Sequence, residues 1–486
     1  MSNKKTDGWA ADEFSQVALG DKRLNKRLVT LCDRFSDSPE SPINQACEDW
    51  AETKAAYRFF KNESVDGDQI FDAHKTKTLE RTKNHQVVLA VQDTSYFIYT
   101  NHPKTRGLGE LSVKNGKHRK EIYSYGLAMH ACMALSTEGL PLGLLDLQIT
   151  ARESINKEKG KAVRDHLPIE QKESYRWLET LRTTNALMKG KQVVTICDRE
   201  CDIYDFFKLS KELDTDVIVR ANANRTINRK SRYAQKDVTK LWGHLMGKSK
   251  AGTYQINIPR KSKSKHCSGR VARTAVVTVR FASFEMNPPR NHAKHKTEDL
   301  PNLKMSAIHV LEENPPEDED PIEWMLLTTL NIISFEDAYE KIGWYALRWR
   351  IEMFFKVLKS GFKVEDCRLS HADRLRRYLT VMSIVGWRIF MITFIARTDP
   401  DLCCSNFLTS LEWKILFLKI HKGKDLPRVT PSIGEAVVWI AKLGGYIGRN
   451  SDGPPGTLTF WRGWKRLSDL TDGQALTLKM RLMTYG

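Results

Sequence analysis

The sequence of 486 residues lacks the long apolar segments of a membrane or secreted protein. Its longest apolar stretch, near residues 381–395, is interrupted by Arg388 and is too short to cross a bilayer. The N-terminus, MSNKKTDGWAADEF, lacks the apolar run of a signal peptide. We therefore expect a cytoplasmic protein without a membrane partner.

The sequence also lacks the paired cysteines of a zinc site or a disulfide framework. Its nine cysteines are an odd number and are scattered along the chain. One close pair, Cys197 and Cys201, has no second pair to complete a zinc site, and the adjacent Cys403 and Cys404 suit neither zinc nor a disulfide. These patterns indicate reduced thiols.

Acidic residues are fewer than basic ones, with Asp+Glu 59 against Lys+Arg 77 and a formal net charge of +18. Residues 225–273 hold 14 Lys and Arg against one acidic residue, and the runs TYQINI and, just beyond the segment, TAVVTVRF indicate strands. This pattern predicts a basic β insertion that contacts a phosphate backbone. The acidic, Pro-rich linker at 313–321 is predicted to be an exposed loop.

Helices are predicted in the first 66 residues. Leu24, Leu28, Leu31 and Phe35 recur at helical spacing, and Asp21 is a plausible N-cap. A second helix is expected at residues 50–60. The basic side chains of the first helix, considered alone, are better explained as a solvated face.

The next part of the sequence predicts an α/β domain. A buried-type strand at 86–92 is expected to end at Asp93, and the strand VVTIC is expected to end at Asp198. Between them we expect strands at 125–134 and 142–149, joined by a turn at 138–139, and a helix at about 168–188. Helices are predicted again at 335–395, 406–420 and 433–444, whereas the aromatic patch FWRGW after them indicates core or an interface.

The segment WYALRWRIEMFFKVLKSGF is the most informative part of the sequence. On one continuous helix, a single face would carry Tyr345, Arg348, Glu352, Lys356 and Lys359. The opposite face would carry the apolar residues Leu347, Ile351, Phe354 and Leu358. An ordinary amphipathic helix explains this pattern by geometry alone. A lone glutamate surrounded by cations, however, also suits a phosphate and metal site.

Three carboxylates could form such a site. Asp93 and Asp198 each follow a buried strand, where open α/β sheets place their sites, and Glu352 would join them from a helix. Carboxylate oxygens suit hard cations, so the three groups could hold two Mg²⁺ ions. Alternatives remain for single residues, because Glu200 or Asp202 could cap the following helix and Tyr345 or Trp324 could simply pack.

The spacing of Tyr345, Arg348, Glu352 and Lys359 resembles the Tyr-Arg-Glu-Lys signature of a group of bacterial DDE transposases. The motifs AVQDTS and CDRECDIY resemble the first- and second-aspartate motifs of that group. Further similarity lies in ALGDKRLNKRL, AAYRFFKN, IEWMLLT, AKLGGYIGR and WRGW, so that the resemblance runs from about residue 19 to about residue 464. The chain is similar to the insertion-sequence-four family, and within it to the transposon-five group.

The resemblance implies a ribonuclease-H-like core with Asp93, Asp198 and Glu352 as ligands of two Mg²⁺ ions, which Mn²⁺ can replace. It implies a homodimer that holds two transposon ends in a synaptic complex, nicks DNA, forms and opens a hairpin, and joins the ends to target DNA. Contacts with DNA are expected from Tyr345, Arg348, Lys356, Lys359, Trp324, Arg220, Arg27 and Arg58. The text after Asp93 departs from the family near Thr100, which puts contacts from that loop in doubt.

The implied organisation has three parts. Residues 1–66 would form a helical end-binding domain, 67–396 a catalytic domain with a β insertion at about 221–322, and 397–486 a helical dimerisation domain. A metal-dependent nuclease or resolvase with the same core, without strand transfer, is an alternative function. A catalytically inactive DNA-binding regulator is another.

Overall fold

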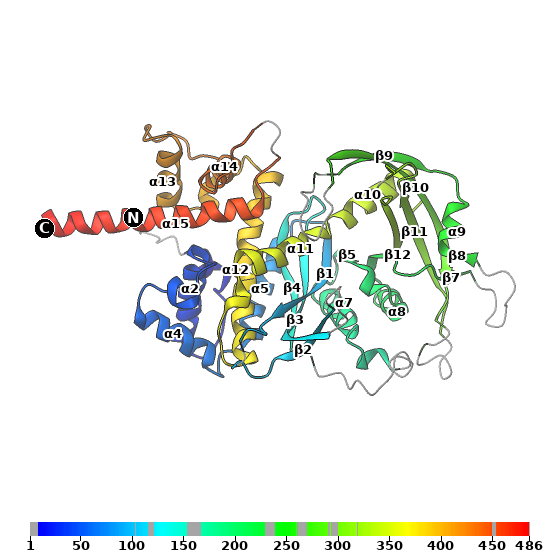
Figure 1. The fold of residues 1–486 in the computed structure, drawn as a ribbon, viewed down its shortest axis with the longest axis horizontal. Helices are drawn as coiled ribbons and strands as arrows, with labels where there is room; N and C mark the ends of the chain where they lie inside the picture. The colour runs from blue at the N-terminus through cyan, green and yellow to red at the C-terminus, as the bar shows by residue number, and fades with distance from the viewer. Residues whose placement is uncertain are drawn as a thin grey trace. The chain divides into compact units, whose positions relative to one another are not determined.

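The computed structural model describes residues 8–102, 104–114, 121–152, 167–228, 239–258, 260, 270–289, 292, 300–317, 319–449 and 453–485. The chain forms two compact units, each assembled from segments that are distant in the sequence. Unit 1 contains Met1–His85, Thr94–Ile155 and Arg350–Gly486, and unit 2 contains Gln86–Asp93 and Asn156–Trp349. Both combine helices with strands (Figure 1), which confirms the predicted mixed α/β class.

A mixed sheet forms the centre of unit 2. Its strands follow the order β1-β5-β6-β12-β11-β10-β7-β8, and β9 also pairs with β10. The first three are parallel neighbours, whereas β6, β12, β11 and β10 pair antiparallel. The strands are β1 (Val87–Ile98), β5 (Gln192–Cys197), β6 (Asp216–Arg220), β7 (Thr226–Ile227), β8 (Thr239–Lys240), β9 (Gly252–Ile258), β10 (Arg273–Met286), β11 (Leu303–Leu311) and β12 (Glu323–Thr328).

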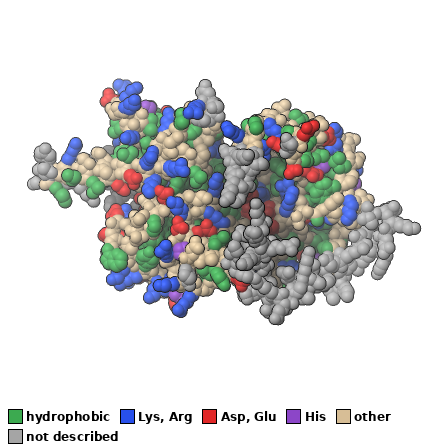
Figure 2. Space-filling model, viewed as in Figure 1, with side chains coloured by type: hydrophobic (Ala, Val, Ile, Leu, Met, Phe, Trp, Pro, Cys, Tyr) green, Lys and Arg blue, Asp and Glu red, His purple; other side chains and the backbone are tan. Residues whose placement is uncertain are grey.

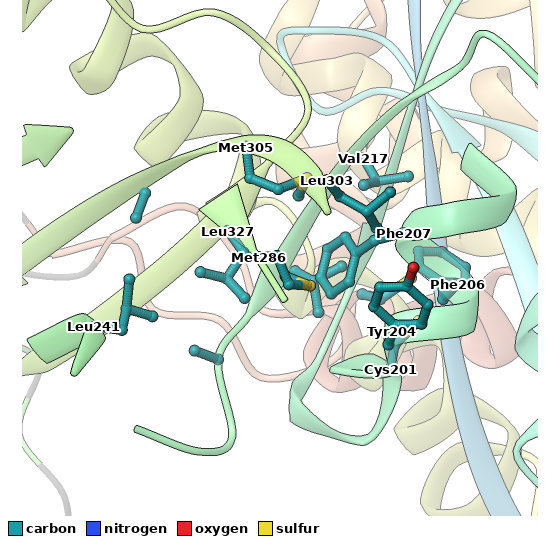
Figure 3. Close-up of a cluster of buried hydrophobic side chains, with 14 of the residues drawn as sticks. Cys201, Tyr204, Phe206, Phe207, Val217, Leu241, Met286, Leu303, Met305 and Leu327 are labelled. Atoms are coloured by element: carbon teal, nitrogen blue, oxygen red, sulfur yellow. The ribbon is translucent and has the colours of Figure 1, made fainter. Parts of the chain in front are cut away.

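The helices of unit 2 cover this sheet through large apolar side chains. They are η1 (Ile169–Gln171), α7 (Tyr175–Leu187), η2 (Arg199–Cys201), α8 (Tyr204–Glu212), α9 (Leu241–Met246) and α10 (Phe335–Ala346). Phe206 and Phe207 of α8 join Met286, Met305 and Leu327 of the strands in one buried cluster (Figure 3). This shared core fixes the sheet edge on which the second-aspartate motif lies.

The predicted β insertion is present as a set of antiparallel strands. Strands β9 and β10 pair from Gly252↔Val279 to Ile258↔Arg273, and β10 then pairs with β11. The described residues of the acidic linker at 313–321 form a mostly exposed loop, as predicted, and Glu319 in it pairs with Arg273. Glu313 pairs with both Lys250 and Arg280. The acidic linker therefore fastens the insertion's own cations.

Unit 1 is mainly helical. Its strands are β2 (Gly109–Lys114), β3 (Glu121–Leu135) and β4 (Pro141–Thr150), together with the end of β1. Its helices are α1 (Trp9–Glu13), α2 (Lys22–Asp37), α3 (Ile43–Ala46), α4 (Trp50–Lys61), α5 (Gly67–Thr82), α11 (Trp349–Lys356, whose first residue belongs to unit 2), the π-helical turn η3 (Val357–Gly361), η4 (Val364–Asp366), α12 (Ala372–Thr398), η5 (Cys404–Asn406), α13 (Ser410–Ile420), α14 (Ile433–Leu443) and α15 (Thr457–Tyr485).

The long helix α12 is the centre of unit 1 (Figure 1). Near its start, Tyr378 packs edge-on against Phe35 of α2 and Phe60 of α4. Farther along, Trp387 donates to the carbonyl of Pro141, at the start of β4. Among the described residues, α12 is the one helix long and apolar enough to cross a membrane, yet 83% of its most apolar window is buried. The apolar stretch predicted from the sequence, residues 381–395, was thus too short. In this structure the helix lies in the core of unit 1.

Two glycines allow α14 and α15 to cross at close range. A Cβ on Gly463 would lie 1.6 Å from the carbonyl oxygen of Ile440, and one on Gly444 would lie 1.9 Å from that of Thr459. These glycines belong to the motifs AKLGGYIGR and WRGW. The aromatic patch that includes Trp464 is buried at this crossing, inside a 29-residue helix that the sequence did not predict.

Other boundaries also differ from prediction. Strand β1 continues through Asp93 to Ile98, and α7 begins at Tyr175 rather than near residue 168. The predicted β3–β4 hairpin is present, with its strands joined next to Gly139, whose φ of 88° suits a glycine turn. The expected N-cap is also present, since the Asp21 carboxylate accepts a hydrogen bond from the Arg23 amide. All eight cysteines in the described part of the chain are free thiols.

Candidate active site

Two aspartates lie side by side on the parallel part of the unit 2 sheet. Val91 of β1 pairs with Ile196 of β5. Asp93 and Asp198 each come two residues later, so the same register carried forward puts them on neighbouring chains and on the same face. Neighbouring strands are about 4.8 Å apart, which brings two carboxylates within reach of a shared cation.

Local structure explains how Asp198 is held. It follows the last residue of β5 and caps the short helix η2, where its carboxylate accepts from the Glu200 amide at 2.8 Å. The suggestion that Glu200 or Asp202 caps the following helix is wrong, because α8 has no side-chain cap. Asp202 instead accepts from the Asn222 amide and pairs with Arg225.

Arg348 lies against the first aspartate. Its Nη1 atom is 3.5 Å from an Asp93 carboxylate oxygen, and both side chains are largely buried, with 14% and 15% exposure. The charges of Asp198, Asp93 and Arg348 all act on the buried Cys197 thiol, whose pKa is raised mainly by burial. The guanidinium therefore belongs to the same small region as the two carboxylates.

An aromatic pair and a second arginine extend this region. The rings of Trp324 and Tyr345 meet edge-on with centroids 5.7 Å apart, and the Arg348 guanidinium lies 6.0 Å from the Tyr345 ring. Arg220 donates to the carbonyl of Glu323 and interacts electrostatically with Tyr345 and Arg348. Burial raises the pKa of Tyr345 and lowers the pKa of Arg220. The structure thus brings together every predicted site residue that belongs to unit 2.

The predicted continuous helix over this motif is wrong. Helix α10 ends at Ala346, a turn occupies residues 347–348, and α11 begins at Trp349. The Arg348 amide bonds the carbonyl of Tyr345, three residues back rather than the four of an α-helix. A π-helical turn then widens the chain around Lys359. The single polar face calculated at 100° per residue is therefore interrupted twice.

The remaining residues of the signature belong to unit 1. Glu352 lies in the first turn of α11, four residues after Arg348 in the chain, and is half-buried. Lys356 ends α11 and is exposed. Lys359 is half-buried with its ammonium 5.2 Å from the Phe97 ring, and burial lowers its pKa. The apolar side of the predicted pattern is correct for Ile351, which is fully buried.

The two predicted N-terminal DNA contacts lie on different helices of unit 1. Arg27 is half-exposed on α2, and Arg58 is exposed on α4. Helix α4 also presents Trp50 and Tyr57, which are 76% and 41% exposed. Figure 2 shows Lys and Arg on the visible face of the N-terminal helices, with acidic side chains between them. Exposed aromatic and basic groups together suit nucleic acid.

The basic segment is only partly available for phosphate. Of its 14 cations, seven lie outside the described residues: Arg229, Lys230, Arg232, Lys236, Lys261, Lys263 and Lys265. Among the rest, Arg225, Lys250 and Arg273 form ion pairs with carboxylates. Lys240, Lys248 and Arg260 are exposed. A simple count of charges therefore overstates how many residues can contact DNA.

The two carboxylates of unit 2 suit a divalent cation. Asp93 and Asp198 supply carboxylate oxygens, the ligands that Mg²⁺ prefers. In the described part of the chain, no three His, Cys, Asp or Glu side chains lie close enough to hold a metal. The pair fits one side of a metal site, and a third carboxylate is needed to complete it.

Sequence reasoning missed Arg199. It follows Asp198 directly, is exposed, and acts electrostatically on Arg220. Its place in the CDRECDIY motif was visible in the sequence, but no periodicity distinguished it from an ordinary surface arginine. With Arg220 and Arg348 it gives this region three cations beside two carboxylates.

Comparisons with known proteins match almost the whole chain. Residues 6–65 match a family described as Transposase DNA-binding, residues 100–385 match Transposase DDE domain, and residues 384–479 match Transposase Tn5 dimerisation domain. Asp198 and Glu352 lie inside the second match, whereas Asp93 precedes it. A solved piggyBac transposase synaptic complex with hairpin DNA aligns over 96% of this chain and 78% of that chain, with 6% identity and a TM-score of 0.36.

Proposed function

Because this chain belongs to the family of transposases with a DDE domain, we propose that it is a cut-and-paste transposase of the transposon-five type. The observation that carries the proposal is the register that sets Asp93 beside Asp198, with Arg348 against Asp93 and Arg220 close to Arg348. Two carboxylates with a cluster of cations suit a site where a metal and a phosphate meet.

We propose that Asp93, Asp198 and Glu352 hold two divalent ions, with Mg²⁺ as the natural metal and Mn²⁺ as a substitute. A DDE domain depends on divalent metal, but the identity of the ions belongs to the proposal. Bound metal would activate the attacking water or 3′-OH and stabilise the departing oxygen. The protein's own contribution is to hold the three carboxylates and to exclude other ligands.

The cations and aromatic rings would position the DNA. Arg220, Arg348 and Lys359 would neutralise phosphates beside the cleaved bond, while Tyr345 orients the two arginines through its hydroxyl. Trp324, which packs edge-on against Tyr345, would stack on a base that leaves the helix when a hairpin forms. Lys356, exposed at the end of α11, would contact the backbone nearby.

The other domains would supply recognition and assembly. The chain has a DNA-binding domain and a dimerisation domain. We propose that Arg27 and Arg58 contact the transposon end and that two copies form a synaptic complex. The 3′ ends of the transposon would then be joined to target DNA. The expected setting is the bacterial cytoplasm, with the protein on the nucleoid when it is bound to DNA.

Strand transfer is the property that tests this function. Purified protein, Mg²⁺, a duplex with the precut end sequence that flanks the gene, and a supercoiled plasmid should yield insertions joined to the 3′ ends. Hydrolysis of the plasmid without joined ends would instead support the nuclease alternative. Sequence-specific binding without either product would identify an inactive regulator.

A further inference from the structure

Phosphate binding alone does not explain why the Arg348 guanidinium lies against the Asp93 carboxylate. The guanidinium lies 3.5 Å from the carboxylate that is proposed to hold a metal. Charges this close and this buried are weakly screened by salt. The arginine therefore neutralises Asp93 where a divalent cation would otherwise do so.

The geometry of the contact allows exchange. A tight guanidinium–carboxylate bond has an N–O distance of about 2.7–2.9 Å and often uses two nitrogens. The bond between Arg273 and Glu319 in the same unit has such a distance, 2.7 Å. The ion pair of Arg348 with Asp93 is longer, at 3.5 Å. It is close enough to compete for the carboxylate and loose enough to be displaced.

The surroundings favour release of Arg348 to an arriving anion. Arg220 and Arg348 act on each other electrostatically, both act on the Tyr345 phenol, and the Arg348 guanidinium lies 6.0 Å from the Tyr345 ring, so two cations lie close to one uncharged group. A DNA phosphate would relieve their repulsion and offer Arg348 a second anion. Asp93 would then be free for metal.

We propose that Arg348 is a placeholder cation that occupies Asp93 in the DNA-free protein and moves to a DNA phosphate on binding, so that DNA and the divalent metal bind cooperatively. The inference rests on the proposed function, since it requires Asp93 to be a metal ligand. It would restrict metal loading, and with it cleavage, to protein that already holds DNA. By thermodynamic reciprocity, metal must strengthen DNA binding by the same factor.

Metal binding itself gives the test, independently of catalysis. Free Mn²⁺ is counted by electron paramagnetic resonance during titration of the full-length protein, with and without the duplex that flanks the gene. The wild type should bind Mn²⁺ about tenfold more tightly with DNA, within the usual range of coupling between sites. Arg348→Ala should bind Mn²⁺ about tenfold more tightly than wild type without DNA, and the effect of DNA should vanish.

Three further variants separate the possible explanations. Arg348→Gln keeps hydrogen-bond donors without the charge and should behave as Arg348→Ala does. Arg220→Ala removes one positive charge from the same region but leaves the partner of Asp93, so most of the coupling should remain. Asp93→Asn should weaken Mn²⁺ binding in both states, and melting curves confirm that each variant is folded.

The outcomes separate the assignment of Asp93 as a metal ligand from the role of Arg348 as a placeholder cation. If Asp93→Asn leaves Mn²⁺ binding unchanged, the proposed ligand set is wrong. A second outcome is that Asp93→Asn weakens Mn²⁺ binding while both Arg348 variants, without DNA, bind Mn²⁺ no more tightly than wild type. In that case Asp93 is a metal ligand, and the placeholder role of Arg348 is refuted. Equal effects of Arg220→Ala and Arg348→Ala would also refute it, because general charge would then be sufficient.

Discussion

A half-buried tryptophan beside two arginines can be packing or a stacking surface for a base. Trp324 meets Tyr345 edge-on, which leaves part of its ring uncovered in unit 2. Trp324→Ala should leave the first nick within about threefold of wild type while slowing hairpin formation about tenfold or more, since stacking on one base is worth about 1–3 kcal/mol. A gel-resolved time course of nicked, hairpin and released DNA measures both steps.

Trp324→Phe is the matched control, because it keeps an aromatic ring at the same place in β12. It should recover part of the hairpin rate. If Trp324 only packs, its replacement by alanine should instead lower the melting temperature and slow nick and hairpin equally. That result would remove the base-stacking role.

Residue types predicted Asp93 and Asp198 as site residues, because each acid follows a buried strand, whereas Arg220 and Trp324 were expected only from the resemblance to the transposase family. Residue types and spacing did not predict the partner of each group. The ion pair of Arg348 with Asp93 depends on the turn at residues 347–348, and a fixed rotation of 100° per residue contains no such turn. Contacts decided by one local break cannot be calculated from periodicity.

At the scale of elements, the crossing of α14 and α15 depends on two glycines. Gly463→Ala would place a methyl group 1.6 Å from the Ile440 carbonyl oxygen, so the helices must separate. We expect a loss of about 1–3 kcal/mol in the free energy of unfolding. Thermal unfolding of the full-length protein measures it.

Gly473→Ala provides a control on the same helix, since a Cβ there meets no atom within 4 Å. That substitution should raise stability by about 0.5–1 kcal/mol through helix propensity alone. Equal melting temperatures for Gly463→Ala and Gly473→Ala would show that the close crossing of α14 and α15 does not matter for stability.

Elements with strong internal patterns were predicted well, and elements shaped by their neighbours were not. Helix α2 has apolar residues at regular spacing and a capping aspartate, and both appear in the structure. Helix α15 contains glycine and follows a Gly/Pro-rich segment, so local sequence did not predict it, and in the structure it packs against α14, α13 and α12. Strand β1 was predicted to stop at Asp93 because its apolar run ends there. In the structure the strand continues, and its residues from Asp93 onward are mostly half-buried.

At the scale of the whole molecule, the surplus charge of +18 predicts DNA binding that weakens steeply with salt. Lys240 and Lys248 are exposed, and the described residues provide neither with a carboxylate in an ion pair. Replacing either by alanine should lower the slope of log K against log salt by about one for each phosphate that the protein no longer neutralises. Binding isotherms at several salt concentrations measure the slope.

Arg273→Ala is the contrasting variant, because Arg273 is already held by Glu312 and Glu319. It should lower stability and leave the slope almost unchanged. A combined change of Arg260, Lys261, Lys263 and Lys265 tests the stretch of sequence between β9 and β10, and the last three of these residues lie outside the described residues. A slope that stays constant in all these proteins would refute a DNA-binding role for the insertion.

The claim that three carboxylates perform the chemistry is tested most directly by cleavage and binding measured together. Asp93→Asn, Asp198→Asn and Glu352→Gln are each compared with wild type on a duplex that contains the transposon end, with and without Mg²⁺. Without Mg²⁺, each variant should bind the end within about threefold of wild type, since phosphate contacts supply the affinity. Each should cleave about a thousandfold more slowly, since several kcal/mol of transition-state stabilisation are lost. Cleavage at near the wild-type rate by any one variant in Mg²⁺ would show that its residue is not a metal ligand.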